Sequence, residues 1–164
     1  MIKRIVFSYP EDYERFYGKI DYKDKVVLDI GADYGSTADF FFCKGASKVI
    51  GVEGNKSIFD QLKKNAEYIP ELFPIFLYVD NSKQISDLLE EYRPDIVKID
   101  CEGCEIVFLD LSNEIFSIPE SYVVETHTRK IENDFKNKLL ENNYKIIYYD
   151  NWTGDVSVII ATHL

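Results

Sequence analysis

Two acidic residues, Asp100 and Glu102, follow directly after the apolar run Ile96–Ile99. A short continuous run of this kind is typical of a strand buried on both faces of a parallel sheet. In open α/β sheets ligands bind beyond the carboxyl ends of the strands, so both side chains are candidates for a reacting site. Two carboxylates so close together could provide a general base for a hydroxyl group. A structural alternative stays open, in which Asp100 orients a cofactor and Glu102 caps the next helix.

A third candidate catalytic residue, His127, follows the apolar run Tyr122–Glu125. Histidine changes charge close to neutral pH, so His127 could accept a proton or contact a substrate, with Glu125 as its partner. A purely structural histidine is the alternative for this position.

The cysteines suggest no further chemistry. Cys101 and Cys104 have the C-x-x-C spacing, but no second pair accompanies them and acidic residues surround them. Such a setting does not favour a reactive thiolate, and a zinc site needs more ligands of this kind. With Cys43 the chain has three cysteines, too few and too irregular for a secreted disulfide framework. We therefore expect no metal site.

The segment Asp29–Gly35 has the composition and context of a ligand-binding loop. It follows the apolar run Val26–Ile30 and precedes a helical pattern. Gly31 permits a sharp turn close to a ligand. A dinucleotide-binding loop has another glycine two residues later, where the diphosphate sits, but here Asp33 would repel phosphate. The loop therefore favours S-adenosylmethionine, which has no phosphate, over NAD. The expected cofactor contacts in this loop are Asp29, Gly31, Ala32, Asp33 and Gly35.

Polar residues after the next strands extend the predicted cofactor site. Glu53 ends the run Val49–Glu53 and could accept hydrogen bonds from both ribose hydroxyls. Asp80 and Asn81 follow the run Ile75–Val79, where the adenine amino group would be recognised, although a simple Asx turn is the alternative. These further cofactor contacts are expected from Glu53, Gly54, Asp80, Asn81 and Asp100.

The elements that must position these residues alternate in type along the chain. Short β-branched runs alternate with amphipathic patterns at 36–44, 57–68, 85–92 and 131–140, as in βα units. The runs Lys145–Tyr149 and Val156–Ala161 flank a turn and predict a closing antiparallel hairpin. We therefore expect an α/β fold: a doubly wound, Rossmann-like domain with a seven-stranded, mostly parallel sheet and a C-terminal antiparallel hairpin. One domain would span 1–164, with an N-terminal helix or flap at 1–25 and the core at 26–164.

Composition narrows the classes of partner. The 164 residues carry a formal net charge of −10, which counts against nucleic acid, because nucleic-acid binders usually present a basic face. No apolar stretch approaches the ~20 residues that span a bilayer. A cytoplasmic protein without a membrane segment is the expectation.

Four stretches together resemble the FkbM-type S-adenosylmethionine-dependent methyltransferases: DIGADYGSTADFF, VIGVEGNKSIFDQLKKN, VKIDCEGCE and VVETH. The resemblance covers most of the chain from residue 26 onward. It implies O-methylation of a sugar or natural-product hydroxyl. The chain departs from the family at Gly54, where a proline is usual, and it lacks an obvious substrate cap, which a homodimer could supply. The resemblance implies that Asp29, Gly31 and Glu53 hold the cofactor and that Asp100 and Glu102 line the reacting site.

Three functions remain open on the sequence. The first is methylation of a small-molecule or glycan hydroxyl, since the Asn/Asp-Pro-Pro-aromatic run of amino-methylating enzymes is absent. The second is an NAD-dependent oxidoreductase, which Asp33 and the lack of a second domain disfavour. The third is a binding module that keeps the sheet without turnover.

Overall fold

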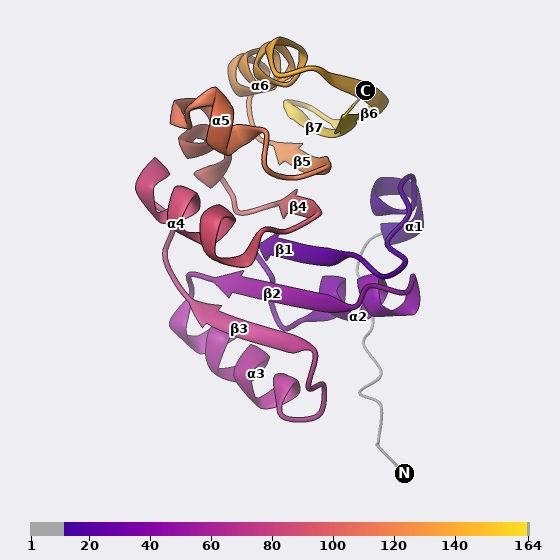
Figure 1. The fold of residues 1–164 in the computed structure, drawn as a ribbon, viewed down its shortest axis with the longest axis vertical. Helices are drawn as coiled ribbons and strands as arrows, with labels where there is room; N and C mark the ends of the chain where they lie inside the picture. Colours follow the sequence, from indigo (N-terminus) through magenta and orange to yellow (C-terminus); the bar gives the residue numbers. More distant parts are fainter. Residues whose placement is uncertain (1–11, 164) are drawn as a thin grey trace. The chain divides into compact units, whose positions relative to one another are not determined.

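The computed structural model describes residues 12–163 (Figure 1). The chain divides into two compact units, residues 1–78 and 79–164. The predicted N-terminal helix or flap at 1–25 includes one described helix, α1 (Tyr13–Tyr17), and residues 1–11 lie outside the described range.

The first unit contains three parallel strands in the order β3-β2-β1. Strands β1 and β2 are buried over almost their whole length, as their continuous apolar sequences predict. Helix α3 packs along β3, as Figure 1 shows. The elements that follow α1 are β1 (Val26–Ile30), α2 (Ser36–Cys43), β2 (Lys48–Glu53), α3 (Lys56–Ala66) and β3 (Leu72–Phe76).

Helix α1 and Tyr22 after it contact the first two turns of α2. Tyr22, which follows α1, stacks on Phe41 of α2 with a ring-centroid distance of 4.9 Å. The Tyr13 hydroxyl lies 2.9 Å from Oγ of Ser36, the first residue of α2. Buried aromatic pairs add about 0.5–1.5 kcal/mol beyond their area burial. These contacts hold the helix that follows the predicted ligand loop.

The predicted third strand, Ile75–Val79, was wrong by three residues, since β3 spans Leu72–Phe76. Pro74 lies inside this strand, opposite Gly51 of β2. Proline has no N–H to donate, so it is tolerated where one side of a strand is not paired. Within the first unit β3 pairs with β2 alone, which explains how a proline lies in the middle of this strand.

The second unit combines parallel and antiparallel strands in the order β4-β5-β7-β6. Strands β4 and β5 are parallel, and β7 is antiparallel to both β5 and β6. The predicted C-terminal hairpin is therefore confirmed. The elements are α4 (Ser82–Tyr92), β4 (Ile96–Ile99), the 3₁₀ helix η1 (Cys104–Asp110), α5 (Asn113–Phe116), β5 (Ser121–Thr126), α6 (Arg129–Glu141), β6 (Tyr144–Thr153) and β7 (Val156–His163).

An aromatic core supports the segment between β4 and β5. Phe116 stacks on Tyr122 with a ring-centroid distance of 4.7 Å, and Phe108 of η1 and Phe135 of α6 pack around them. The Tyr122 hydroxyl donates a hydrogen bond of 2.8 Å to the carbonyl of Phe116. The sequence analysis did not predict η1 or α5, because both are too short to show a helical period.

The fold class is confirmed: the structure is α/β, with a seven-stranded mixed sheet that is mostly parallel and antiparallel at its C-terminal strands. The four long predicted helices are present, with ends shifted by at most three residues. Within residues 12–163, every helix is too short or too polar to cross a bilayer.

Candidate functional site

The loop between β1 and α2 bends tightly and is bonded to β2. The backbone N–H groups of Gly31 and Ala32 both donate to the carbonyl of Val52, at 2.9 and 3.0 Å. Gly31 and Gly35 have φ values of 80° and 96°, in the left-handed region that glycine adopts without strain. Asp33 between them also has a positive φ of 50°. The glycines are therefore required by the backbone path itself.

Glu53 organises the same loop through its carboxylate. One oxygen accepts a 3.1 Å hydrogen bond from the backbone N–H of Asp33, and the other accepts a 2.7 Å bond from the N–H of Asn55. A carboxylate has about four acceptor positions. Two therefore remain for a ligand hydroxyl, and the loop sets the orientation of the carboxylate in advance.

Asp29 is fully buried at the end of β1. Its Oδ2 accepts a 2.5 Å hydrogen bond from the Thr37 hydroxyl, in the first turn of α2. The predicted cofactor ligand thus also ties the strand to the helix. Thr37 was not singled out from the sequence, although a hydroxyl residue in the turn after the loop is a recognisable signal.

Gly51 is a second residue that the sequence analysis missed. A Cβ at this position would lie 3.1 Å from the Cβ of Ala32, so the loop and β2 approach each other closely there. A glycine inside a buried apolar strand indicates such an approach. The run Val49–Glu53 therefore already contained this signal.

Gly54 faces the chain after β3. A Cβ here would lie 3.1 Å from Cδ2 and 3.2 Å from Cα of Tyr78. This close approach accounts for glycine at a position where the FkbM-type sequences usually carry proline. Its predicted contact with a cofactor stays a prediction.

Asp80 and Asn81 form the start of α4. The Asn81 side chain accepts a 3.1 Å hydrogen bond from the backbone N–H of Gln84, and the Gln84 side chain reaches back to the Asn81 N–H, which is a capping box. Asp80 accepts a 2.7 Å bond from the Asn81 amide. The structure places both residues four or more positions beyond the end of β3, in the local turn that was the alternative interpretation. Adenine recognition by them stays a prediction.

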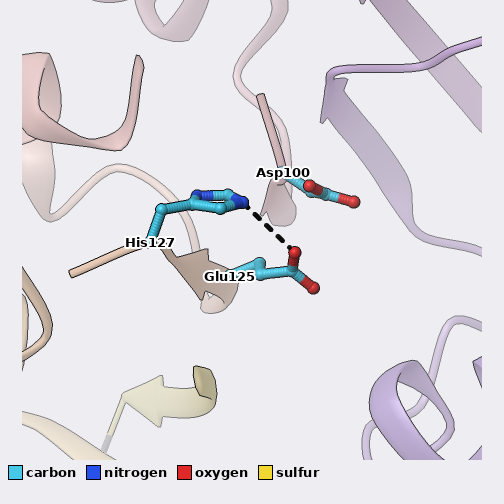
Figure 2. A group of neighbouring side chains, drawn as sticks. All are labelled: Asp100, Glu125 and His127. Atoms are coloured by element: carbon cyan, nitrogen blue, oxygen red, sulfur yellow. Dashed lines mark ion pairs between the residues drawn. The ribbon is translucent and has the colours of Figure 1, made fainter. Parts of the chain in front are cut away.

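The structure brings Asp100, Glu125 and His127 together at the carboxyl ends of β4 and β5. One ligand atom of each lies within 4.8 Å of the others. We call these three residues the strand-end cluster, and Figure 2 shows their side chains converging. Nε2 of His127 lies 3.3 Å from Oε1 of Glu125, a pair that the sequence analysis anticipated.

Glu105, which the sequence analysis missed, orients the imidazole from the other side. Its Oε1 lies 3.0 Å from Nδ1 of His127 and accepts a second 3.0 Å bond from the His127 backbone N–H. Its Oε2 accepts a bond from the N–H of Gly103. Glu105 is fully buried in η1, an element without a clear sequence signal, so nothing in the sequence pointed to this role.

These carboxylates set the charge of His127. Hydrogen bonds to Glu105 and Glu125 raise the pKa of His127 from 6.5 to about 10, against the opposing effect of burial. Burial would raise the pKa of Glu105, but the hydrogen bonds that it accepts outweigh burial and lower this pKa. At neutral pH, and with no other cation beside it, the imidazole is therefore a cation and a hydrogen-bond donor.

Glu102 does not cap the helix that follows it. Its side chain is 86% exposed, with Oε2 3.4 Å from Nε2 of His127. Gly103, and not Glu102, occupies the N-cap position of η1. The helix-capping alternative for Glu102 was therefore wrong, while a catalytic role stays a prediction.

Cys101 and Cys104, the first residue of η1, are joined in a disulfide with a Cα–Cα distance of 5.5 Å. The sequence analysis did not anticipate this bond. Cys43 is a free, exposed cysteine. The disulfide joins the residue after Asp100 to the residue before Glu105, so it stiffens the segment from which both carboxylates come.

Comparison with other proteins supports the fold and gives few functional details. No protein-family model matches the sequence. The chain is 39% identical over 98 residues to the uncharacterized protein 158B of Sulfolobus islandicus rod-shaped virus 1, which is 59% of each protein. It is 35% identical over 99 residues to the uncharacterized protein 65 of Sulfolobus islandicus filamentous virus, 60% of this chain and 58% of that one. The chain thus matches less than two thirds of the length of these relatives.

Solved structures resemble the chain over most of its length. A protein of the NADB-Rossmann superfamily from Streptococcus agalactiae has a TM-score of 0.73 at 17% identity, covering 96% of this chain and 69% of that one. The m1A22 tRNA methyltransferase TrmK of B. subtilis gives 0.68 at 16%, with 99% and 66% covered. Aeropyrum pernix fibrillarin with bound S-adenosyl-L-methionine gives 0.61 at 17%, with 87% and 69% covered. The chain therefore has the Rossmann-like fold of these three structures.

Proposed function

We propose that this protein is an S-adenosylmethionine-dependent methyltransferase. The observation that carries the proposal is the loop Asp29–Gly35, closed onto the carboxylate of Glu53. Gly31 and Gly35, with φ in the left-handed region, let the backbone approach a ligand. Glu53 keeps acceptor capacity for the two ribose hydroxyls. The bound S-adenosyl-L-methionine in the fibrillarin neighbour supports the same cofactor.

The charge of the loop favours this cofactor over a dinucleotide. Asp33 stands where a dinucleotide-binding loop has a glycine, and Glu53 bonds to the Asp33 backbone N–H, which a diphosphate would otherwise need. The carboxylate of Asp33 therefore belongs to the part of the loop where a dinucleotide presents its diphosphate. S-adenosylmethionine has no phosphate and carries a positive sulfonium and an ammonium, so this carboxylate is compatible with it.

A hydroxyl group is the acceptor that we favour. S-adenosylmethionine supplies a methyl group activated by a sulfonium, so a hydroxyl acceptor has only to be oriented and to lose a proton. Asp100 and Glu125 are carboxylates that can accept this proton, and the imidazolium of His127 can stabilise their ionised form. The resemblance to FkbM-type enzymes supports a sugar or small-molecule hydroxyl.

RNA is a second candidate acceptor, because one neighbour is a tRNA methyltransferase and others are fibrillarins. The net charge of −10 was our reason to consider nucleic acid unlikely. A net charge does not exclude a local basic patch, so both acceptor classes belong in the same assay.

The test is isothermal titration of the purified chain with S-adenosylhomocysteine, with NADH in parallel. Binding of S-adenosylhomocysteine alone is the expected result, and binding of NADH alone would overturn the proposal. Transfer of labelled methyl from S-adenosylmethionine to hydroxylated small molecules, sugars or RNA then identifies the acceptor class. Binding without transfer to any acceptor would favour the non-catalytic binding module.

A further inference from the structure

The strand-end cluster and Glu105 carry an excess of negative charge in a largely buried place. Three carboxylates with mostly buried side chains, those of Asp100, Glu105 and Glu125, lie around His127. A second cation, Lys98, lies beside them, with Nζ 3.8 Å from Oδ2 of Asp100. Three buried negative charges therefore face the charges of His127 and Lys98. Buried charge that is not compensated is costly, so a further cation would stabilise this arrangement.

Glu125 points to where that cation would bind. Its side chain is only 9% exposed. Oε1 of this carboxylate lies 3.3 Å from Nε2 of His127. A carboxylate has about four acceptor positions. Glu125 thus has acceptor capacity beyond this contact that a bound ion could use.

The imidazole is arranged as a metal ligand would be. Metal-bound histidines usually give their second ring N–H to a carboxylate, which fixes the ring and its tautomer. Glu105 provides this contact at Nδ1, at 3.0 Å, and Glu105 is itself held by the Gly103 N–H. Nε2 is then directed to the side where Asp100 and Glu125 lie, as Figure 2 shows.

We propose that Asp100, Glu125 and His127 bind a divalent transition-metal ion, which replaces the Nε2 proton of His127 and releases it to solvent, with Glu105 as the residue that positions His127. The sequence analysis expected no metal, because it considered the cysteines and not this combination. Two carboxylates and one imidazole suit Mn²⁺ or Zn²⁺, whereas Ca²⁺ takes oxygen ligands only. At metal–ligand bonds of about 2.1 Å the ligand atoms lie about 3–4.2 Å apart, so atoms within 4.8 Å need only small side-chain rotations.

The ion would have coordination positions left for water or an acceptor oxygen. A metal-bound hydroxyl loses its proton at lower pH than a free one. This consequence rests on the proposed methyltransferase function, whereas binding of the ion does not.

The test uses the full chain, freed of metal with a chelator and titrated with Mn²⁺, with free Mn²⁺ followed by electron paramagnetic resonance. One Mn²⁺ per chain is expected, displaced by Zn²⁺ and not by Ca²⁺. Glu125→Gln and Asp100→Asn should each weaken binding by about 10–100-fold or more, and Glu105→Gln by about 10–100-fold. Glu114→Gln, an exposed acid of the same unit, is the matched control and should bind as the wild type does.

Circular dichroism of each variant shows whether it folds. If Glu125→Gln does not fold, Asp100→Asn still tests the site, because the Asp100 side chain is partly exposed. The metal site is overturned if the wild type binds neither Mn²⁺ nor Zn²⁺, or if folded Glu125→Gln or Asp100→Asn binds Mn²⁺ as the wild type does. Titration with S-adenosylhomocysteine separates the two proposals. Metal binding without S-adenosylhomocysteine binding overturns the proposed methyltransferase function and leaves the metal site standing. Binding of S-adenosylhomocysteine without metal binding overturns the metal site alone.

Discussion

The loop after β1 and the strand-end cluster are held in place by different kinds of bond. The loop is held by backbone: N–H groups of Gly31, Ala32 and Asp33 bond to β2 and to Glu53. The cluster is held by side chains: the buried carboxylate of Glu105 is hydrogen-bonded to the imidazole of His127. The loop should tolerate substitution of its side chains, except at its glycines and at Glu53, which accepts the backbone hydrogen bond. The arrangement of the cluster depends on each of its charged side chains. The two regions should therefore respond differently to substitution.

Removal of the buried carboxylate should have the largest effect. Glu105→Ala leaves two backbone N–H groups and the imidazole without their acceptor, so it should lower the free energy of unfolding by about 3–5 kcal/mol. Urea unfolding measures this loss. Glu102→Ala is the matched control, because that carboxylate faces the same imidazole but is 86% exposed, and it should cost less than about 1 kcal/mol. Equal costs for the two would show that burial does not govern the cluster.

The carboxylate of the loop should affect ligand binding more than stability. Glu53→Ala should weaken S-adenosylhomocysteine binding by about 10–100-fold, because a hydrogen bond to a charged group is worth about 1.5–3 kcal/mol. Isothermal titration measures the affinity. Glu67→Ala, an exposed acid of the same unit, should leave it unchanged. An unchanged affinity in Glu53→Ala would remove this residue from the cofactor site.

Acid should destabilise the protein through carboxylates of the second unit. Burial would raise the pKa of Glu132, but hydrogen bonds from Lys136 and Ser157 lower it from 4.5 to about 2. A lowered folded-state pKa stabilises the protein above pH 4.5, and this contribution is lost as the pH falls towards 2. Glu132→Gln should cost about 1.5–3 kcal/mol in urea unfolding at pH 7 and much less at pH 2.5. An equal cost at both pH values would contradict the assignment.

Glycines at the start of a helix allow the finest comparison. Gly35 and Gly103 are the N-cap residues of α2 and η1, with φ values of 96° and 119°. Alanine at either position should cost about 1–2 kcal/mol in thermal unfolding, because a Cβ strains the left-handed backbone. Only Gly35→Ala should also weaken S-adenosylhomocysteine binding. If both variants weakened it equally, the loop after β1 would have no special part in binding.

Much of the fold could be predicted because its signals are local. Continuous apolar runs identified β1, β4 and β5 nearly to the residue, and helix-length periods identified α2, α3, α4 and α6. The third strand was misplaced by three residues, and only the pairing of β3 with β2 shows that Pro74 lies within it. The short elements η1 and α5 gave no period to detect.

The sequence by itself predicted the loop after β1, because glycines between a buried strand and a helical pattern indicate a tight turn with left-handed φ values. It also identified Asp100, Glu125 and His127 as strand-end residues. Only the tertiary structure decided that these three side chains meet and that Glu105 holds the imidazole. The separation between their atoms depends on the register of β4 against β5 and on the packing of η1, and neither follows from local sequence.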